Sequence, residues 1–164
     1  MNWRHPALGA VAVFLVQFFL SEYLTIQRIR PDFLLIYVMY VALRNGSTQG
    51  VIYGFALGIF EDFLSAGSLL GLAPLTKSIT GFLIGRLRGK FSRMNPFVFH
   101  LAWVAVALLH FVVYIYVSYQ SVYEISQLLF WQTWILVAAY TFVFIGIMQI
   151  ILPFHRIYPD EKLA

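Results

Sequence analysis

The sequence predicts an all-α, polytopic membrane protein with six transmembrane helices, the second of them short, and with both termini in the cytoplasm. Of its 164 residues, 61% are hydrophobic and only 11% are charged, and the mean hydropathy is +0.80. Soluble domains have a much more polar composition. Several segments reach or approach the roughly 20 apolar residues that a bilayer core of about 30 Å requires. We therefore expect residues 1–164 to form a single integral membrane domain.

Six apolar segments are the candidate spans. They cover Ala7–Ile26, Phe33–Leu43, Gln49–Leu64, Leu69–Leu87, Phe97–Ser118 and Gln127–Leu152. The first is expected to stay on the chain as a signal anchor, because its apolar core is too long for a signal peptide and no small-x-small cleavage site follows. The second would cover only about 16 Å as a helix. We expect a snorkelling Arg44 or local thinning of the bilayer to extend it.

The basic residues indicate the number of crossings, because Lys and Arg accumulate in cytoplasmic loops. Six crossings place eight basic residues on one side of the membrane, leave two on the other, and put Lys77 within a span. The larger group is Arg4, Arg44, Arg86, Arg88, Lys90, Arg93, Arg156 and Lys162, and the smaller is Arg28 and Arg30. If the second segment did not cross, this asymmetry would collapse. The sequence therefore favours six spans.

Glycines recur at every fourth position in spans three and four. The two rows are Gly50, Gly54, Gly58 and Asp62, and then Lys77, Gly81, Gly85 and Gly89. Small residues at this spacing let helices approach closely in lipid. We expect the rows to pack the two spans into an antiparallel hairpin. The alternative is that one row stays open for the transmembrane helix of a partner.

Four charged residues form a predicted polar cluster at the outer ends of the spans. They are Asp32, Glu61, Asp62 and Lys77. The matched registers of the hairpin predict an Asp62–Lys77 pair, since both charges are costly to hold alone at membrane depth. A row at i+4 spacing drifts by about 40° per step, which argues against that pair. Asp32, behind Pro31, favours a helix N-cap, and an outward-facing polar pocket is the alternative role for the cluster.

The remaining polar residues exclude several classes of function. His100 and His110 are about 15 Å apart along one predicted helix, too far to chelate one metal, so we expect hydrogen bonds between helices. The adjacent carboxylates Glu61 and Asp62 diverge on a helix, so no catalytic pair forms, and no motif for a metal or cofactor is present. The basic residues lie in loops and form no nucleic-acid-binding face.

One basic loop is predicted in the cytoplasm. It contains Arg86, Arg88, Lys90 and Arg93. Its first role is to set the topology, and contact with anionic lipid or with a cytoplasmic partner is an alternative.

The central part of the chain, from about Pro31 to Leu87, resembles the MreD family of bacterial rod-shape membrane proteins. The matching features are Pro31-Asp32 before an apolar segment, Ala42-Leu43-Arg44 leading to Gly46, the series Gly50, Gly54, Gly58 ending in Asp62, Gly71-Leu72, and Gly81 with Gly85. The first, fifth and sixth spans carry no distinctive match.

The resemblance implies a non-enzymatic scaffold in the bacterial inner membrane that helps to organise peptidoglycan synthesis. Its implied partners are an MreC-like protein, the actin-like MreB, and RodA with its penicillin-binding transpeptidase. Assembly with further copies of the same chain is an alternative. The alternative is a substrate-binding component of an energy-coupling-factor vitamin transporter, which is similar in size and helix number. Such components usually carry an Ala-x-x-x-Ala surface on the first helix, and this first span has no alanine pair at that spacing.

Overall fold

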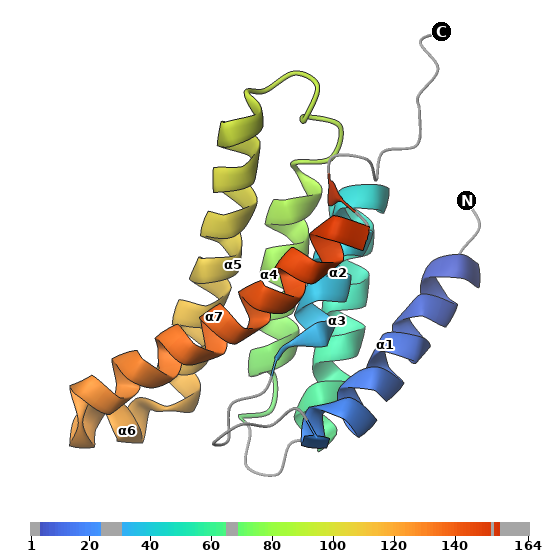
Figure 1. The fold of residues 1–164 in the computed structure, drawn as a ribbon. Coiled ribbons are helices and arrows are strands. Elements are labelled where there is room, and N and C mark those ends of the chain that lie inside the picture. The colour runs from blue at the N-terminus through green and yellow to red at the C-terminus, as the bar shows by residue number, and fades with distance from the viewer. Residues whose placement is uncertain (1–3, 24–30, 65–68, 152, 155–164) are drawn as a thin grey trace, which may run out of the picture.

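The computed structural model describes residues 4–23, 31–64, 69–151 and 153–154. This described part is helical and contains no strand (Figure 1). Its elements are α1 (Arg4–Tyr23), α2 (Phe33–Asn45), α3 (Ser47–Leu64), α4 (Leu72–Gly85), α5 (Pro96–Ser118), α6 (Gln120–Ile125) and α7 (Gln127–Ile151). The predicted all-α class is therefore confirmed.

Six helices correspond to the six predicted segments, and the six-residue helix α6 between α5 and α7 was not predicted. By length and composition, α5 and α7 are apolar enough to cross a membrane. The other long helices do not meet that criterion, so the number of crossings stays a prediction. The ends of the first and last predicted segments lie outside the described residues, as do Arg28, Arg30, Arg156 and Lys162.

Helix α4 is shorter than the predicted span, with 14 residues. It begins after Gly71, whose φ of 100° places the backbone in the left-handed region that favours glycine. Beyond Gly85 the chain passes into turns, and Gly89 there also has a positive φ, of 69°. Gly89 therefore belongs to a turn and not to the glycine row of α4.

The short helix α2 lies inside the bundle. It packs against α1, α3 and α4, and eight of its 13 residues are buried. A helix that is apolar on all sides is typical of such a position. Because protein covers α2, its length of about 20 Å does not need to match the thickness of the lipid. Arg44 lies at its exposed end, with Nη1 3.5 Å from the hydroxyl of Tyr40.

The glycines of α3 and α4 face one another, as predicted for a tight hairpin. A Cβ on Gly54 would lie 2.6 Å from the carbonyl oxygen of Lys77, and one on Gly50 would collide with Gly81. A Cβ on Gly58 would likewise collide with Pro74, and a Cβ on Gly85 would collide with Ser47. Both rows are therefore filled by the protein itself. The alternative, an open row that receives a partner's helix, is wrong for this structure.

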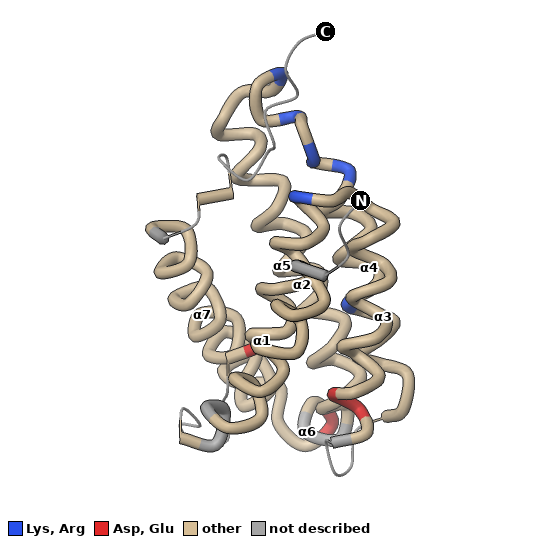
Figure 2. Tube along the Cα trace, turned by 90° about the vertical axis from the view of Figure 1, so that its right-hand side faces the viewer, with Lys and Arg blue, Asp and Glu red and all other residues tan. Residues whose placement is uncertain are grey.

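Apart from Lys77, which is buried within α4, the described charged residues divide between the two ends of the bundle (Figure 2). The described basic loop residues lie where α4 ends and α5 begins, and α1 begins at this same end (Figure 1). The described acidic residues lie towards the opposite end, where α2 begins and α3 ends. Helix α7 crosses the bundle obliquely and contacts α5 and α6.

Candidate functional site

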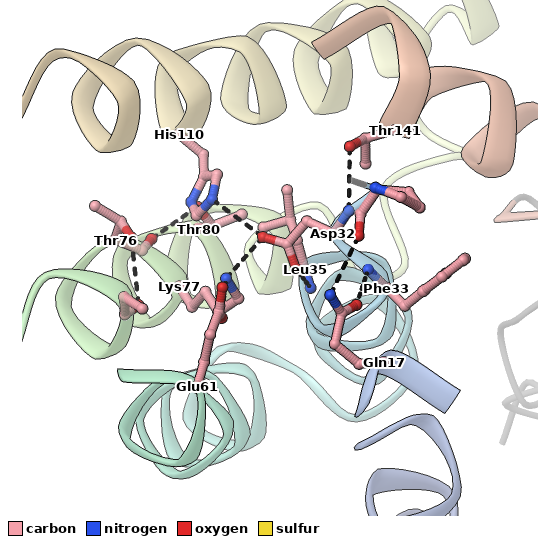
Figure 3. A network of polar contacts seen from close by, with 12 residues as sticks. Gln17, Asp32, Phe33, Leu35, Glu61, Thr76, Lys77, Thr80, His110 and Thr141 are labelled. Atoms are coloured by element: carbon pink, nitrogen blue, oxygen red, sulfur yellow. Dashed lines mark hydrogen bonds and ion pairs between the residues drawn. The ribbon is translucent and has the colours of Figure 1, made fainter. Parts of the chain in front are cut away.

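A buried ionic network surrounds Lys77 of α4 (Figure 3). The Lys77 side chain is completely buried, and its Nζ lies 2.7 Å from Oδ2 of Asp32 and 2.6 Å from Oε2 of Glu61. The two carboxylates are 15% and 18% exposed. Lys77 thus links α4 to the beginning of α2 and to α3. A buried cation held by two carboxylates meets the requirement that charges at membrane depth be paired.

Asp32 uses its two carboxylate oxygens for different tasks. Oδ1 accepts a hydrogen bond of 2.8 Å from the backbone N–H of Leu35, which makes Asp32 the N-cap of α2. Oδ2 binds Lys77. The predicted cap is therefore confirmed, and the same side chain also belongs to the ionic network.

The backbone around Asp32 is held by the first and last long helices. The N–H of Asp32 donates to Oγ1 of Thr141 in α7, at 3.3 Å. Gln17 of α1 accepts from the N–H of Phe33 at 2.8 Å and donates to the carbonyl of Pro31 at 3.3 Å. Residues 31–33, which we call the α2 entry, therefore receive contacts from α1, α4 and α7.

His110 connects α5 to the same network. Its Nδ1 lies 3.3 Å from Oγ1 of Thr80 in α4, and its Nε2 lies 3.7 Å from Oδ2 of Asp32. The ring stacks on Tyr114 with centroids 5.9 Å apart, and Nζ of Lys77 lies 5.6 Å from the Tyr114 ring centroid. The predicted hydrogen bond between helices is confirmed for His110.

The same prediction is wrong for His100. Its Nδ1 accepts a hydrogen bond of 3.0 Å from Nε1 of Trp103, which lies one turn further along the same helix. Residues three apart on a helix are neighbours, so the bond closes locally without another helix.

The predicted Asp62–Lys77 pair is replaced by Glu61–Lys77. Glu61 follows Gly50 by 11 residues, which is close to three full turns and returns it to within about 20° of the face that contacts α4. Asp62 lies a further 100° or so around the helix. It is buried, and its Oδ2 accepts a hydrogen bond of 2.7 Å from the N–H of Gly71 in the turn before α4.

Three of the four predicted cluster residues therefore meet, and Asp62 lies beside them. Sequence reasoning missed Gln17, Thr80, Tyr114 and Thr141. His110 and Tyr114, four residues apart on one helix, share a face, and that spacing was a usable signal. Gln17 and Thr141 gave no such signal, because single polar residues on apolar helices have many possible partners.

The predicted basic loop lies at the far end of the bundle from the ionic network (Figure 2). Arg86, Arg88, Lys90 and Arg93 are all exposed. The Cζ atom of Arg86 lies 4.6 Å from the centroid of the Phe82 ring, and Nη1 of Arg88 donates to the carbonyl of Asn45 at 3.3 Å. The loop and the network are therefore separate features.

Comparison with protein families identifies the chain. The family described as rod shape-determining protein MreD matches residues 6–156. The chain belongs to the MreD family. No curated protein and no solved structure gives a significant match.

Membership confirms the resemblance noted in the central block and extends it over nearly the whole chain. MreD proteins are membrane proteins that determine rod shape, and they are not known as an enzyme family. The match also favours the rod-shape interpretation over a vitamin transporter. The glycine hairpin and the ionic network are thus internal features of an MreD protein.

Proposed function

We propose that this MreD protein is a non-enzymatic scaffold of the bacterial inner membrane that binds an MreC-like partner and helps to organise peptidoglycan synthesis. The family match carries the proposal. The site geometry supports it, because the polar groups around Lys77 bind one another and fasten helices together. MreB and RodA with its transpeptidase are further proposed members of the assembly.

The proposed topology has six crossings with both ends of the chain in the cytoplasm. The long helices alternate in direction, and α1 begins and α7 ends at the same end of the bundle (Figure 1). The exposed residues Arg44, Arg86, Arg88, Lys90 and Arg93 lie at that end. Basic residues favour the cytoplasmic side, which orients the bundle.

The partner's helix is proposed to bind a lipid-facing surface, since the rows on α3 and α4 are filled. Gly146 of α7 is the one helical glycine among the described residues at which a Cβ would meet no other atom within 4 Å. It is exposed, next to Ile147, which is 47% exposed. An exposed glycine lets a second helix approach closely in lipid.

Affinity purification of the tagged protein from its native membrane in mild detergent tests this function. We expect mass spectrometry to identify an MreC-like protein in the eluate, and we expect Gly146→Leu to lower its recovery. Ile147→Leu is the matched control, because it changes the neighbouring exposed position without adding bulk.

Recovery of paired ATPases with a coupling membrane subunit would overturn the scaffold function in favour of the transporter. Equal recovery of the MreC-like protein with Gly146→Leu would preserve the scaffold and remove α7 as the contact.

A further inference from the structure

An apolar groove of about 160 Å³ runs between α4 and α5 at the surface of the bundle. Its apolar lining is Ile79 and Leu83 of α4 and Val106, Leu109 and Val113 of α5. Ile79, Leu109 and Val113 are 47%, 49% and 39% exposed, so the groove opens onto the outer surface of the bundle, which faces lipid in the proposed topology.

The polar groups at the base of the groove already have partners. The Thr80 hydroxyl donates to the carbonyl of Thr76 at 2.8 Å and contacts His110, and the Thr76 hydroxyl donates to the carbonyl of Leu72 at 2.9 Å. All three of Thr76, Thr80 and His110 are buried. The remaining buried nitrogen, Nε2 of His110, lies 3.7 Å from Oδ2 of Asp32. The groove therefore offers its occupant mainly apolar contact. This chemistry suits a hydrocarbon chain.

Arg86 lies directly after α4, at the end of the bundle that the proposed topology places in the cytoplasm (Figure 1). It is the C-cap residue of α4, and its backbone keeps helical angles (φ −70°, ψ −18°). It follows Ile79 by seven residues, which is nearly two turns, so it continues the face of α4 that carries Ile79. Arg86 is exposed, and its guanidinium lies against the ring of Phe82, which is itself 40% exposed. The charge is thereby held on the lipid-facing side of the helix, about one turn beyond Leu83.

The charge of this end is uncompensated within the described part of the chain. Its exposed basic residues are Arg44, Arg86, Arg88, Lys90 and Arg93. The ion pairs among the described residues all involve Asp32 or Glu61 at the other end. An exposed apolar surface follows the loop directly: Phe97 and Val98, in the first turn of α5, are 72% and 45% exposed. The cations of the loop therefore lie near the level of the lipid headgroups.

We propose that the α4–α5 groove is a binding site for an anionic glycerophospholipid. One acyl chain lies in the groove against Ile79, Leu109 and Val113, and the phosphate lies at Arg86. An arginine guanidinium is well suited to bind phosphate. The charge at the groove's end distinguishes this occupant from a zwitterionic lipid, and the narrow volume distinguishes it from a whole helix.

Native mass spectrometry of the delipidated full chain tests the site. The probes are dioleoyl phosphatidylglycerol, dioleoyl phosphatidylcholine with the same chains, and soluble glycerol phosphate. We expect phosphatidylglycerol to bind most tightly and glycerol phosphate not to bind. Arg86→Gln should weaken the binding of phosphatidylglycerol about fivefold, equivalent to about 1 kcal/mol, with little change for phosphatidylcholine. Arg44→Gln is the matched control, because it removes the same charge at the same end but on α2.

A second pair of variants tests the hydrocarbon part of the site. Val113→Trp fills the groove and should weaken both lipids, whereas Val112→Trp changes the adjacent residue, which is 41% exposed and does not line the groove. Equal effects of Arg86→Gln and Arg44→Gln would overturn the proposal, since general attraction to the basic end would then explain the binding. Equal effects of the two Trp variants would also overturn it. Loss of partner recovery in Val113→Trp without any loss of lipid would assign the groove to a protein helix instead.

Discussion

At the scale of single residues, Asp32 concentrates two kinds of interaction in one carboxylate. One oxygen caps α2 through Leu35, and the other binds Lys77. The sequence predicted the cap, because a carboxylate directly before an apolar helix is a local signal. It did not predict which acidic residue of α3 meets Lys77. The i+4 spacing of the glycines pointed to Asp62, whereas Glu61 lies almost three full turns from Gly50 and so shares its face.

The two roles of Asp32 can be separated by two substitutions. Asn is about as good an N-cap as Asp, so Asp32→Asn should lose the ionic interaction and keep the cap. Asp32→Ala should lose both, and should unfold more easily than Asp32→Asn by about 1 kcal/mol. Unfolding in mixed micelles of SDS, followed by the fluorescence of the four tryptophans, measures the difference. Equal losses would show that the bond to Leu35 contributes no stability.

The partner of Lys77 can be tested by double-mutant cycles. Lys77→Met alone leaves buried carboxylates without their cation and should cost about 3–5 kcal/mol. With Glu61→Gln in the same chain, part of this loss should return, which gives a coupling energy of about 1 kcal/mol or more. Asp62→Asn should couple to Lys77→Met by less than about 0.5 kcal/mol. A larger coupling for Asp62 than for Glu61 would contradict the observed pairing.

At the scale of elements, the α3–α4 hairpin is the tightest unit of the bundle. The close backbone approach at Gly50, Gly54 and Gly81 leaves no space for a methyl group. The hairpin could be predicted from the sequence because glycines at regular spacing on adjacent spans have few other uses. The bounds of α4 were less predictable: the predicted span covered Leu69–Leu87, whereas the helix covers Leu72–Gly85.

Substitution of Gly54 should therefore weaken the fold before it affects any partner. In Gly54→Ala the new methyl group would meet the carbonyl of Lys77, and separating the two helices should cost about 1–3 kcal/mol. Gly146→Ala is the control, because its surroundings are open and Ala favours a helix by up to about 1 kcal/mol. The midpoint of thermal unfolding in detergent should fall for the first and hold or rise for the second. Unchanged stability of Gly54→Ala would argue against the close contact.

At the scale of the whole molecule, the segregation of charge defines an axis through the bundle. Exposed cations mark one end, and the carboxylates of the ionic network lie towards the other (Figure 2). The six membrane-length or apolar helices other than α6, and the position of the basic loop, could be predicted from composition and loop charge. The oblique path of α7 and the contacts of Gln17 and Thr141 could not, because these depend on how distant helices meet.

The proposed orientation can be tested with single cysteines, because the sequence contains none. Ser92→Cys lies in the basic loop and Gln120→Cys at the start of α6, and both positions are exposed. In intact spheroplasts, a membrane-impermeant maleimide should label Gln120→Cys, and it should label Ser92→Cys only after lysis. Labelling of both positions before lysis would contradict the six-span topology.

The convergence of helices on the α2 entry has a consequence for how the protein is made. The backbone N–H of Asp32 finds its acceptor on Thr141, which the ribosome adds more than 100 residues later. Lys77 and His110 are also added only after the whole of α2 has been synthesised. Early in synthesis, the translocon therefore receives the short helix α2, capped by Asp32, before the residues that bind Asp32 have been added. A nascent chain that stops before α7 therefore lacks the acceptor for the backbone N–H of Asp32.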